Sequence, residues 1–163
     1  MTVFGKPLSD YVSFCKLFLG LILIVGITRL ALSLGGVPNS TAKWLSMTAV
    51  AWIGLVYYAV RVHTSGFGSY KHLLPICLLQ SWAAQLVVVP SIILAIFTGK
   101  DNIYSAPEFF FQRDGKTWLH VAGHLTLGSF VAPLIAWLVG CVIMFVTKKV
   151  VTGDRSTKAP ARA

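Results

Sequence analysis

The sequence predicts an all-α fold: a four-helix transmembrane bundle with short loops and one longer external loop at the membrane interface. Of the 163 residues, 56% are hydrophobic and only 12% are charged, against about 25% charged residues in a soluble domain. The mean hydropathy of +0.75 points the same way. Four mostly apolar stretches each have the roughly 20 residues that a helix needs to cross a bilayer. These observations exclude a water-soluble domain and favour an integral, multi-pass membrane protein.

The expected helices cover residues 11–34, 43–62, 72–98 and 117–147. They form one transmembrane domain over residues 1–150. Gly and Pro residues between positions 35 and 38 mark the first turn, and a Gly- and Ser-rich reversal at 64–69 separates the second helix from the third.

The one long connection, residues 99–116, holds three of the five acidic residues of the chain and the triple phenylalanine at 109–111. Three adjacent Phe side chains in water are an aggregation hazard. We therefore expect this loop to lie on the membrane surface, with the rings in the headgroup boundary.

The formal net charge is +9. The Lys and Arg residues are spread along the chain and flank apolar stretches, whereas a nucleic-acid-binding surface gathers them on one face. We expect the lipid bilayer as a partner and no nucleic acid. Cytoplasmic loops are enriched in Lys and Arg, and nine of these residues lie on the side of both termini against five on the other. The N- and C-termini are therefore predicted to be cytoplasmic, with a basic, disordered tail at 151–163.

Polar residues inside the apolar stretches are informative, because each costs a few kcal/mol in lipid unless it is paired or functional. In the third helix, Gln80, Gln85 and Ser91 fall on one arc of a helical wheel, and this arc must face protein. We expect the two glutamines to form hydrogen bonds between helices. In the first helix, Arg29 lies near the external end, where its side chain can reach headgroups or bind an anionic group.

The most specific pattern is the pair His120 and His124 at the external start of the fourth helix. Residues at i and i+4 share a face, the spacing at which a helix offers two imidazoles to one metal ion, and haem also takes axial histidine ligands. No Glu lies between them, so structural hydrogen bonding and polar substrate handling stay open as alternatives. We expect the pair to form one external ligand-binding site with Arg29 and Ser91.

Small residues recur on the opposite face of this helix, at Thr126, Ser129 and Gly140. Such spacing marks a close contact between membrane helices. At 100° per residue, a helical wheel therefore predicts that these residues pack against a neighbour while the histidines point elsewhere.

The sequence leaves three hypotheses for function. The first is a non-catalytic accessory or structural subunit of a membrane complex, or a homo-oligomer, with other membrane subunits or copies of itself as partners. The second is a protein that binds haem or a divalent metal through His120 and His124. The third is a small transporter or lipid-handling protein with an external polar site. No nucleophile with a base, carboxylate pair or phosphate loop is visible, so we expect a protein that is not an enzyme.

Overall fold

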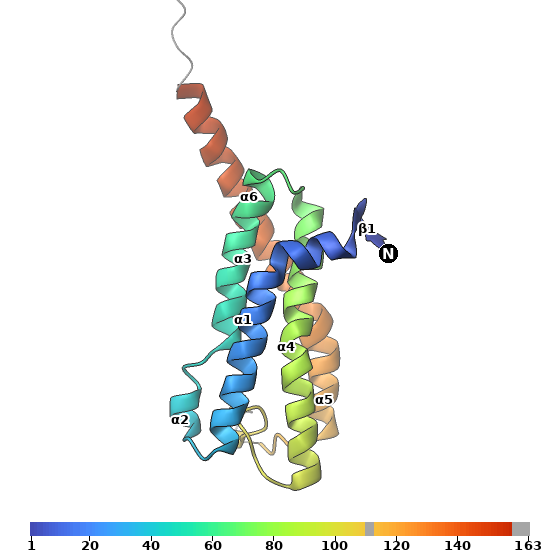
Figure 1. Ribbon diagram of the computed structural model, residues 1–163, viewed down its shortest axis with the longest axis vertical. Coiled ribbons are helices and arrows are strands. Elements are labelled where there is room, and N and C mark those ends of the chain that lie inside the picture. Colours follow the sequence, from blue (N-terminus) through green and yellow to red (C-terminus); the bar gives the residue numbers. More distant parts are fainter. Residues whose placement is uncertain (110–112, 158–163) are drawn as a thin grey trace, which may run out of the picture.

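The computed structural model describes residues 1–109 and 113–157, and it confirms the all-α, four-helix fold (Figure 1). Helices make up 78% of the structure, and the sheet in the described residues is one N-terminal hairpin of two short strands. Four helical segments are long and apolar enough to cross a membrane. In chain order the elements are β1 (Thr2–Val3), β2 (Lys6–Pro7), α1 (Leu8–Leu34), α2 (Asn39–Ala42), α3 (Met47–Thr64), α4 (Tyr70–Thr98), η1 (Pro107–Phe109), α5 (Trp118–Gly123), η2 (His124–Val131) and α6 (Ala132–Thr157).

The two ends of the bundle carry different parts of the chain (Figure 1). The N-terminal hairpin and the end of α6 lie at one end, which we call the termini end; the connection between α4 and α5 lies at the other, the loop end. α6 continues through Thr157, so the expected tail at 151–163 begins inside this helix, and residues 158–163 lie outside the described residues.

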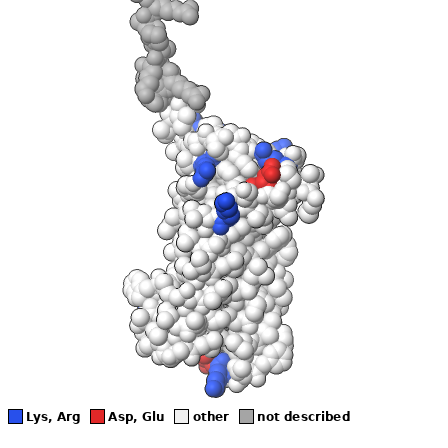
Figure 2. Space-filling view, viewed as in Figure 1, with Lys and Arg blue, Asp and Glu red and all other residues white. Residues whose placement is uncertain are grey.

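The outer surface of the bundle suits lipid. Large apolar side chains point outward along the spans; Leu86 is 70% exposed, Leu119 81% and Leu127 62%. Figure 2 shows the charged side chains of this face near the two ends, with an uncharged band between them. Since transfer of such a surface into water is unfavourable, the bilayer is the solvent that this band requires.

α4 is the central helix, because it packs against α1, α3, α5, η2 and α6. Its buried face contributes to two apolar clusters. The first gathers Tyr11, Tyr58 and Leu73 toward the termini end. The second joins Ile22 of α1, Val87 of α4 and other apolar side chains toward the loop end. Gln80 and Ser91, 4% and 2% exposed, lie on this same buried side of α4.

The connection between α4 and α5 differs from the expected surface loop, because its first half enters the bundle. Asn102 is 1% exposed, and its Nδ2 donates to the carbonyl of Ser91 at 2.7 Å. The hydroxyl of Tyr104 donates to the carbonyl of Gly26 in α1 at 2.9 Å. Burial raises the pKa of Tyr104 to about 12, so this hydroxyl keeps its proton at neutral pH. The segment closes the loop end of the bundle.

The rings of the triple phenylalanine at 109–111, which we expected in the headgroup boundary, lie outside the described residues. Their predicted position stays a prediction.

Candidate functional site

The fourth span consists of α5, η2 and α6; the π-helical segment η2 follows α5 at His124 and gives way to α6 just before Pro133. Proline has no backbone N–H, so Pro133 can supply neither the α-helical bond to the Ser129 carbonyl nor the π-helical bond to the Gly128 carbonyl. Two α4 side chains take its place. Ser81 Oγ donates to the Gly128 carbonyl at 2.5 Å, and Trp82 Nε1 donates to the Ser129 carbonyl at 3.1 Å. The π-helical turns are thus held by α4; such turns are frequent at functional sites.

The π-helical segment also changes which residues share a face. Its hydrogen bonds run from i to i+5, so each residue turns through less than the 100° of an α-helix. A 100° wheel therefore assigns residues before and after η2 to the wrong faces relative to one another. It places His124 opposite Ser129 and Gly140, yet His124 lines the same cleft as Pro133 and Ala136. The wheel puts Pro133 and Ala136 on that opposite face as well, so the predicted separation into two faces does not hold for His124.

The small residues of the fourth span follow the same shift. A Cβ atom at Gly140 would lie 2.5 Å from Leu73 Cδ2, so α6 and α4 meet closely there, and Ser129 is buried. Thr126 is instead exposed, and its hydroxyl donates to the Ala122 carbonyl of its own helix at 2.7 Å. The expected packing role thus fits Ser129 and Gly140 and does not fit Thr126.

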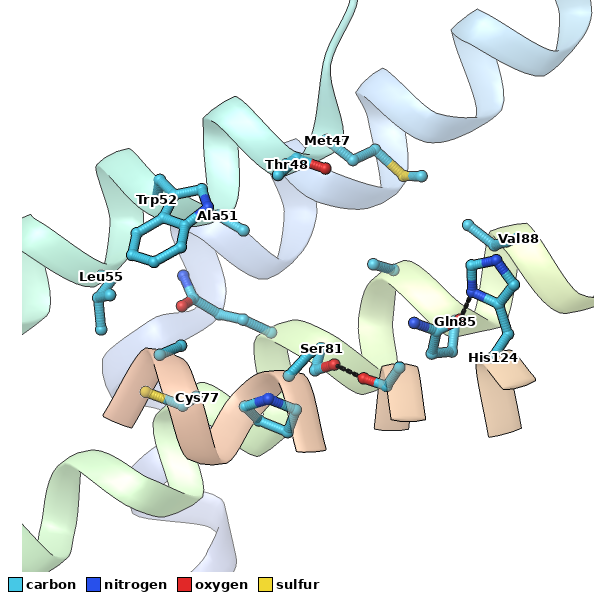
Figure 3. A pocket seen from close by; sticks show the side chains of 16 residues that line it. Met47, Thr48, Ala51, Trp52, Leu55, Cys77, Ser81, Gln85, Val88 and His124 are labelled. Atoms are coloured by element: carbon cyan, nitrogen blue, oxygen red, sulfur yellow. Dashed lines mark hydrogen bonds between the residues drawn. The ribbon is translucent and has the colours of Figure 1, made fainter. Parts of the chain in front are cut away.

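A cleft of about 250 Å³ lies between α3, α4 and the η2–α6 part of the fourth span (Figure 3). In the described structure η2 packs mainly against α4, α5 and α6, whereas the main contact of α3 with the fourth span is to α6. The cleft lies where these two segments separate, with Trp52 and Ala132 exposed at its rim. Along α4 it extends from Cys77 to Val88, or about 16 Å at 1.5 Å per residue. No Lys, Arg, Asp or Glu is among its described lining residues.

His124 and Gln85 form a hydrogen-bonded pair on the wall of the cleft, with 2.9 Å between His124 Nδ1 and Gln85 Oε1 (Figure 3). An amide oxygen can only accept, so Nδ1 carries the imidazole proton and Nε2 the lone pair. The same bond orients the amide and directs Gln85 Nε2 toward Gly128. A Cβ atom at Gly128 would lie 2.5 Å from Gln85 Nε2, so this glycine makes room for the amide.

Gln80 lines the part of the cleft nearer the termini end. Its Nε2 lies against Gly54 of α3, where a Cβ atom would overlap with it. In the described part of the chain, Gln80 Nε2 has no hydrogen-bond partner. The expected hydrogen bond between helices is thus formed by Gln85 and not by Gln80. A buried polar group without a partner costs about 1–3 kcal/mol, so Gln80 does not serve the stability of the fold.

The structure separates Arg29 and Ser91 from this cleft. The guanidinium carbon of Arg29 lies 5.4 Å from the ring centre of Tyr104 at the loop end. The hydroxyl of Ser91 donates to the Val87 carbonyl of its own helix at 2.6 Å. Of the four residues expected in one polar site, His124 is the one that lines the cleft.

The two histidines lie side by side, with 5.0 Å between their ring centres. His120 Nδ1 donates to the Gly115 carbonyl at 2.9 Å, because a carbonyl can only accept. A metal ion would meet two imidazoles here. Among the described residues, no third His, Cys, Asp or Glu completes a group of metal ligands. Binding of haem or a divalent metal at His120 and His124 stays a prediction.

Sequence reasoning missed the residues that shape the cleft. A helical wheel of α4 puts Trp82 on the apolar side, away from Gln80 and Ser91, although its indole N–H is a donor to η2. No sequence pattern marked Gly54 and Gly128 as the glycines that make room for the two amides. One signal was available: a proline inside a membrane helix leaves carbonyls that a neighbouring helix must satisfy.

No protein-family model matches this chain, and no curated protein and no solved structure matches it. The fold and the site define the class of the protein. It is a helical, multi-pass membrane protein with an uncharged, laterally placed cleft between its spans.

Proposed function

We propose that the protein is a non-catalytic membrane protein that binds a neutral, lipid-soluble molecule in the cleft between α3, α4 and α6. The observation that carries this proposal is the cleft itself: about 250 Å³, on the side of the bundle, without a charged residue in its described lining. A molecule that reaches it from the bilayer must be lipid-soluble. Because an unpaired charge is far more costly to bury than a neutral polar group, the lining favours an uncharged ligand. This proposal develops the lipid-handling hypothesis.

The composition of the cleft wall also supports a binding role. Ligand pockets in proteins are mostly apolar, with a few polar groups that orient the ligand. Here apolar residues such as Leu55 and Val88 surround Gln80, Gln85 and His124. The cleft therefore offers hydrophobic contact together with a small number of hydrogen-bonding groups.

The hydrogen bonds in the wall favour binding over catalysis. The hydroxyl of Ser81 is used by the Gly128 carbonyl, and the imidazole N–H of His124 is used by Gln85. A catalytic serine needs a base within hydrogen-bond reach, and neither of these two hydrogen bonds joins Ser81 to His124. We therefore assign no reaction to the cleft.

The hypothesis of an accessory subunit or homo-oligomer remains a second proposal, since a helix of another subunit could cover the same rim at Trp52 and Ala132. Insertion in the cell membrane with both termini in the cytoplasm is also a proposal. It is supported by the excess of Lys and Arg on the side of the termini.

Photolabelling in lipid nanodiscs tests the proposed function. The probe is a ten-carbon alkane that carries a diazirine, which is neutral and lipid-soluble. We expect saturable labelling of the peptides of α3, α4 and η2–α6 that face the cleft. Ala132→Phe, which fills the exposed rim, should lower this labelling by about tenfold, the effect of about 1.4 kcal/mol in binding.

The matched control is Val131→Phe, because Val131 is exposed and is not among the residues that line the cleft. This variant should label like the wild type. Labelling that rises linearly with probe concentration on all lipid-facing surfaces, or that falls equally in both variants, would contradict the proposed function.

A further inference from the structure

The two glutamines of the cleft share one unusual arrangement. Each amide lies on a glycine of a facing segment: Gln80 on Gly54 of α3, and Gln85 on Gly128 of η2. A Cβ atom at either glycine would collide with the amide nitrogen. Two long polar side chains are thus accommodated in a lipid-facing protein by positions that lack a side chain.

The hydrogen bonds around these amides leave N–H groups of both glutamines for a ligand. The oxygen of Gln85 accepts a hydrogen bond from His124, so the two N–H groups of this amide are what it offers to a ligand. Gln80 Nε2, in the described structure, donates to no partner. The hydroxyl of Ser81, which also lines the cleft, and the indole N–H of Trp82 are already used by the carbonyls of η2. A ligand that carries acceptor atoms can therefore bond the N–H groups of both amides.

The spacing of the two amides limits the shape of a ligand that serves both. Gln80 and Gln85 are five positions apart on α4, or about 7.5 Å along the helix axis at 1.5 Å per residue. Two acceptor atoms on opposite edges of a flat ring can face both amides. A single carbonyl or hydroxyl can face one of them.

From this arrangement, and resting on the proposed function, we infer that the ligand is a neutral, quinone-like molecule. Its two ring carbonyl oxygens accept hydrogen bonds from the amide groups of Gln80 and Gln85, and an apolar tail leaves the cleft past Trp52 and Ala132. Binding in this way requires the terminal torsion of Gln80 to turn, because its Nε2 lies against Gly54 in the structure. His124 is a positioning residue, because its N–H holds the oxygen of Gln85 and so directs the N–H groups of that amide.

A pair of competitors tests this inference against the photolabel. The first is 2-decyl-1,4-benzoquinone, and the second is decylbenzene, which has the ring and the tail without the oxygens. For the wild type we expect the quinone to compete at least about tenfold better, since each amide–carbonyl hydrogen bond contributes a factor of several. Gln80→Leu and Gln85→Leu should each reduce this preference by about fivefold, and decylbenzene should compete with both variants as it does with the wild type.

His124→Leu provides a second measurement, because it keeps both glutamines and removes only the N–H that orients Gln85. It should reduce the preference for the quinone while decylbenzene competition stays unchanged, which a general loss of folding cannot produce. Retained decylbenzene competition also reports that each variant is folded.

The outcomes separate the two proposals. If both compounds compete equally with the wild-type protein, or if the preference survives in both glutamine variants, the quinone-like head group is wrong while the lipid-soluble ligand stands. If neither compound competes, the proposed function fails and this inference fails with it.

Discussion

Gln80 and Gln85 are the same residue type on the same helix, yet their surroundings differ. The oxygen of Gln85 accepts from His124, which ties α4 to η2. Gln80 is 4% exposed, and its Nε2 has no partner among the described residues. One amide therefore contributes to the fold, whereas the other is kept at a cost in stability, as is typical of a group retained for binding.

This contrast predicts opposite effects of one substitution. Gln80→Leu removes an unsatisfied amide and should raise the free energy of unfolding by about 1–2 kcal/mol. Gln85→Leu leaves the His124 N–H without an acceptor and should lower it by about 1–3 kcal/mol. Thermal unfolding of both variants in the same detergent measures the two shifts. Shifts of the same sign would show that the two amides are not in different environments.

The glycines that make room for the two amides give a second prediction. Gly128→Ala puts a Cβ atom 2.5 Å from Gln85 Nε2, so the flexible amide must move, and the preference for the quinone over decylbenzene should fall by about fivefold. Gly123→Ala is the control, because a Cβ atom there meets nothing within 4 Å. It should leave the preference unchanged and raise stability by about 0.5–1 kcal/mol through helix propensity. The competition assay measures the preference for the quinone, and a thermal melt measures the stability. An equal preference in the two variants would show that Gly128 does not position the Gln85 amide.

At the scale of elements, the fourth span depends on α4 for its shape. Pro133 withholds an N–H, and the donors from Ser81 and Trp82 satisfy the Gly128 and Ser129 carbonyls instead. The wide turns of η2 then bring His124 to the cleft that Pro133 also lines. The π-helical turns that precede this proline thereby affect which face of the span carries the histidine.

The donors of α4 should therefore matter more than other hydroxyls in the spans. Ser81→Ala leaves the Gly128 carbonyl unsatisfied and should lower the free energy of unfolding by about 1–2 kcal/mol. Thr126→Ala is the matched control, since the hydroxyl of exposed Thr126 bonds a carbonyl of its own helix, and its effect should stay within about 0.5 kcal/mol. Denaturation in mixed micelles can compare the two; an equally small effect for Ser81→Ala would show that η2 does not need this donor.

Sequence patterns predicted the four spans, because their length and hydropathy are local properties. The polar arc of α4 was also predictable, since α4 follows the regular 100° wheel through Gln80 and Ser91. The arrangement of the fourth span was not, because the wheel assumes an α-helix and η2 departs from it. The contact between Tyr104 and Gly26 joins residues 78 positions apart; a pairing of this kind has no local signal.

At the scale of the whole molecule, the bundle presents an uncharged band between two charged ends (Figure 2). The termini end carries Lys and Arg side chains over aromatic rings, such as Lys6 over Phe67 and Lys148 over Tyr70. Cations on aromatic rings at the membrane boundary fit a protein that is anchored at the headgroup level.

The proposed orientation can be tested with introduced cysteines and a membrane-impermeant maleimide on intact cells. Lys100 and Ser65 are both exposed and lie at opposite ends of the bundle, whereas Asn102 is too buried for a probe. Lys100→Cys should react from outside, and Ser65→Cys should react only after the cells are opened. The reverse pattern would invert the topology and would leave the cleft unchanged.

The most direct test of the central claim, that the cleft holds a neutral lipid-soluble molecule, is native mass spectrometry of the full chain released from its own membranes. We expect one neutral adduct per chain, retained at collision energies that strip phospholipid, present in Val131→Phe and lost in Ala132→Phe. A bare chain, or charged-lipid adducts of equal abundance in the wild type and both variants, would contradict the claim.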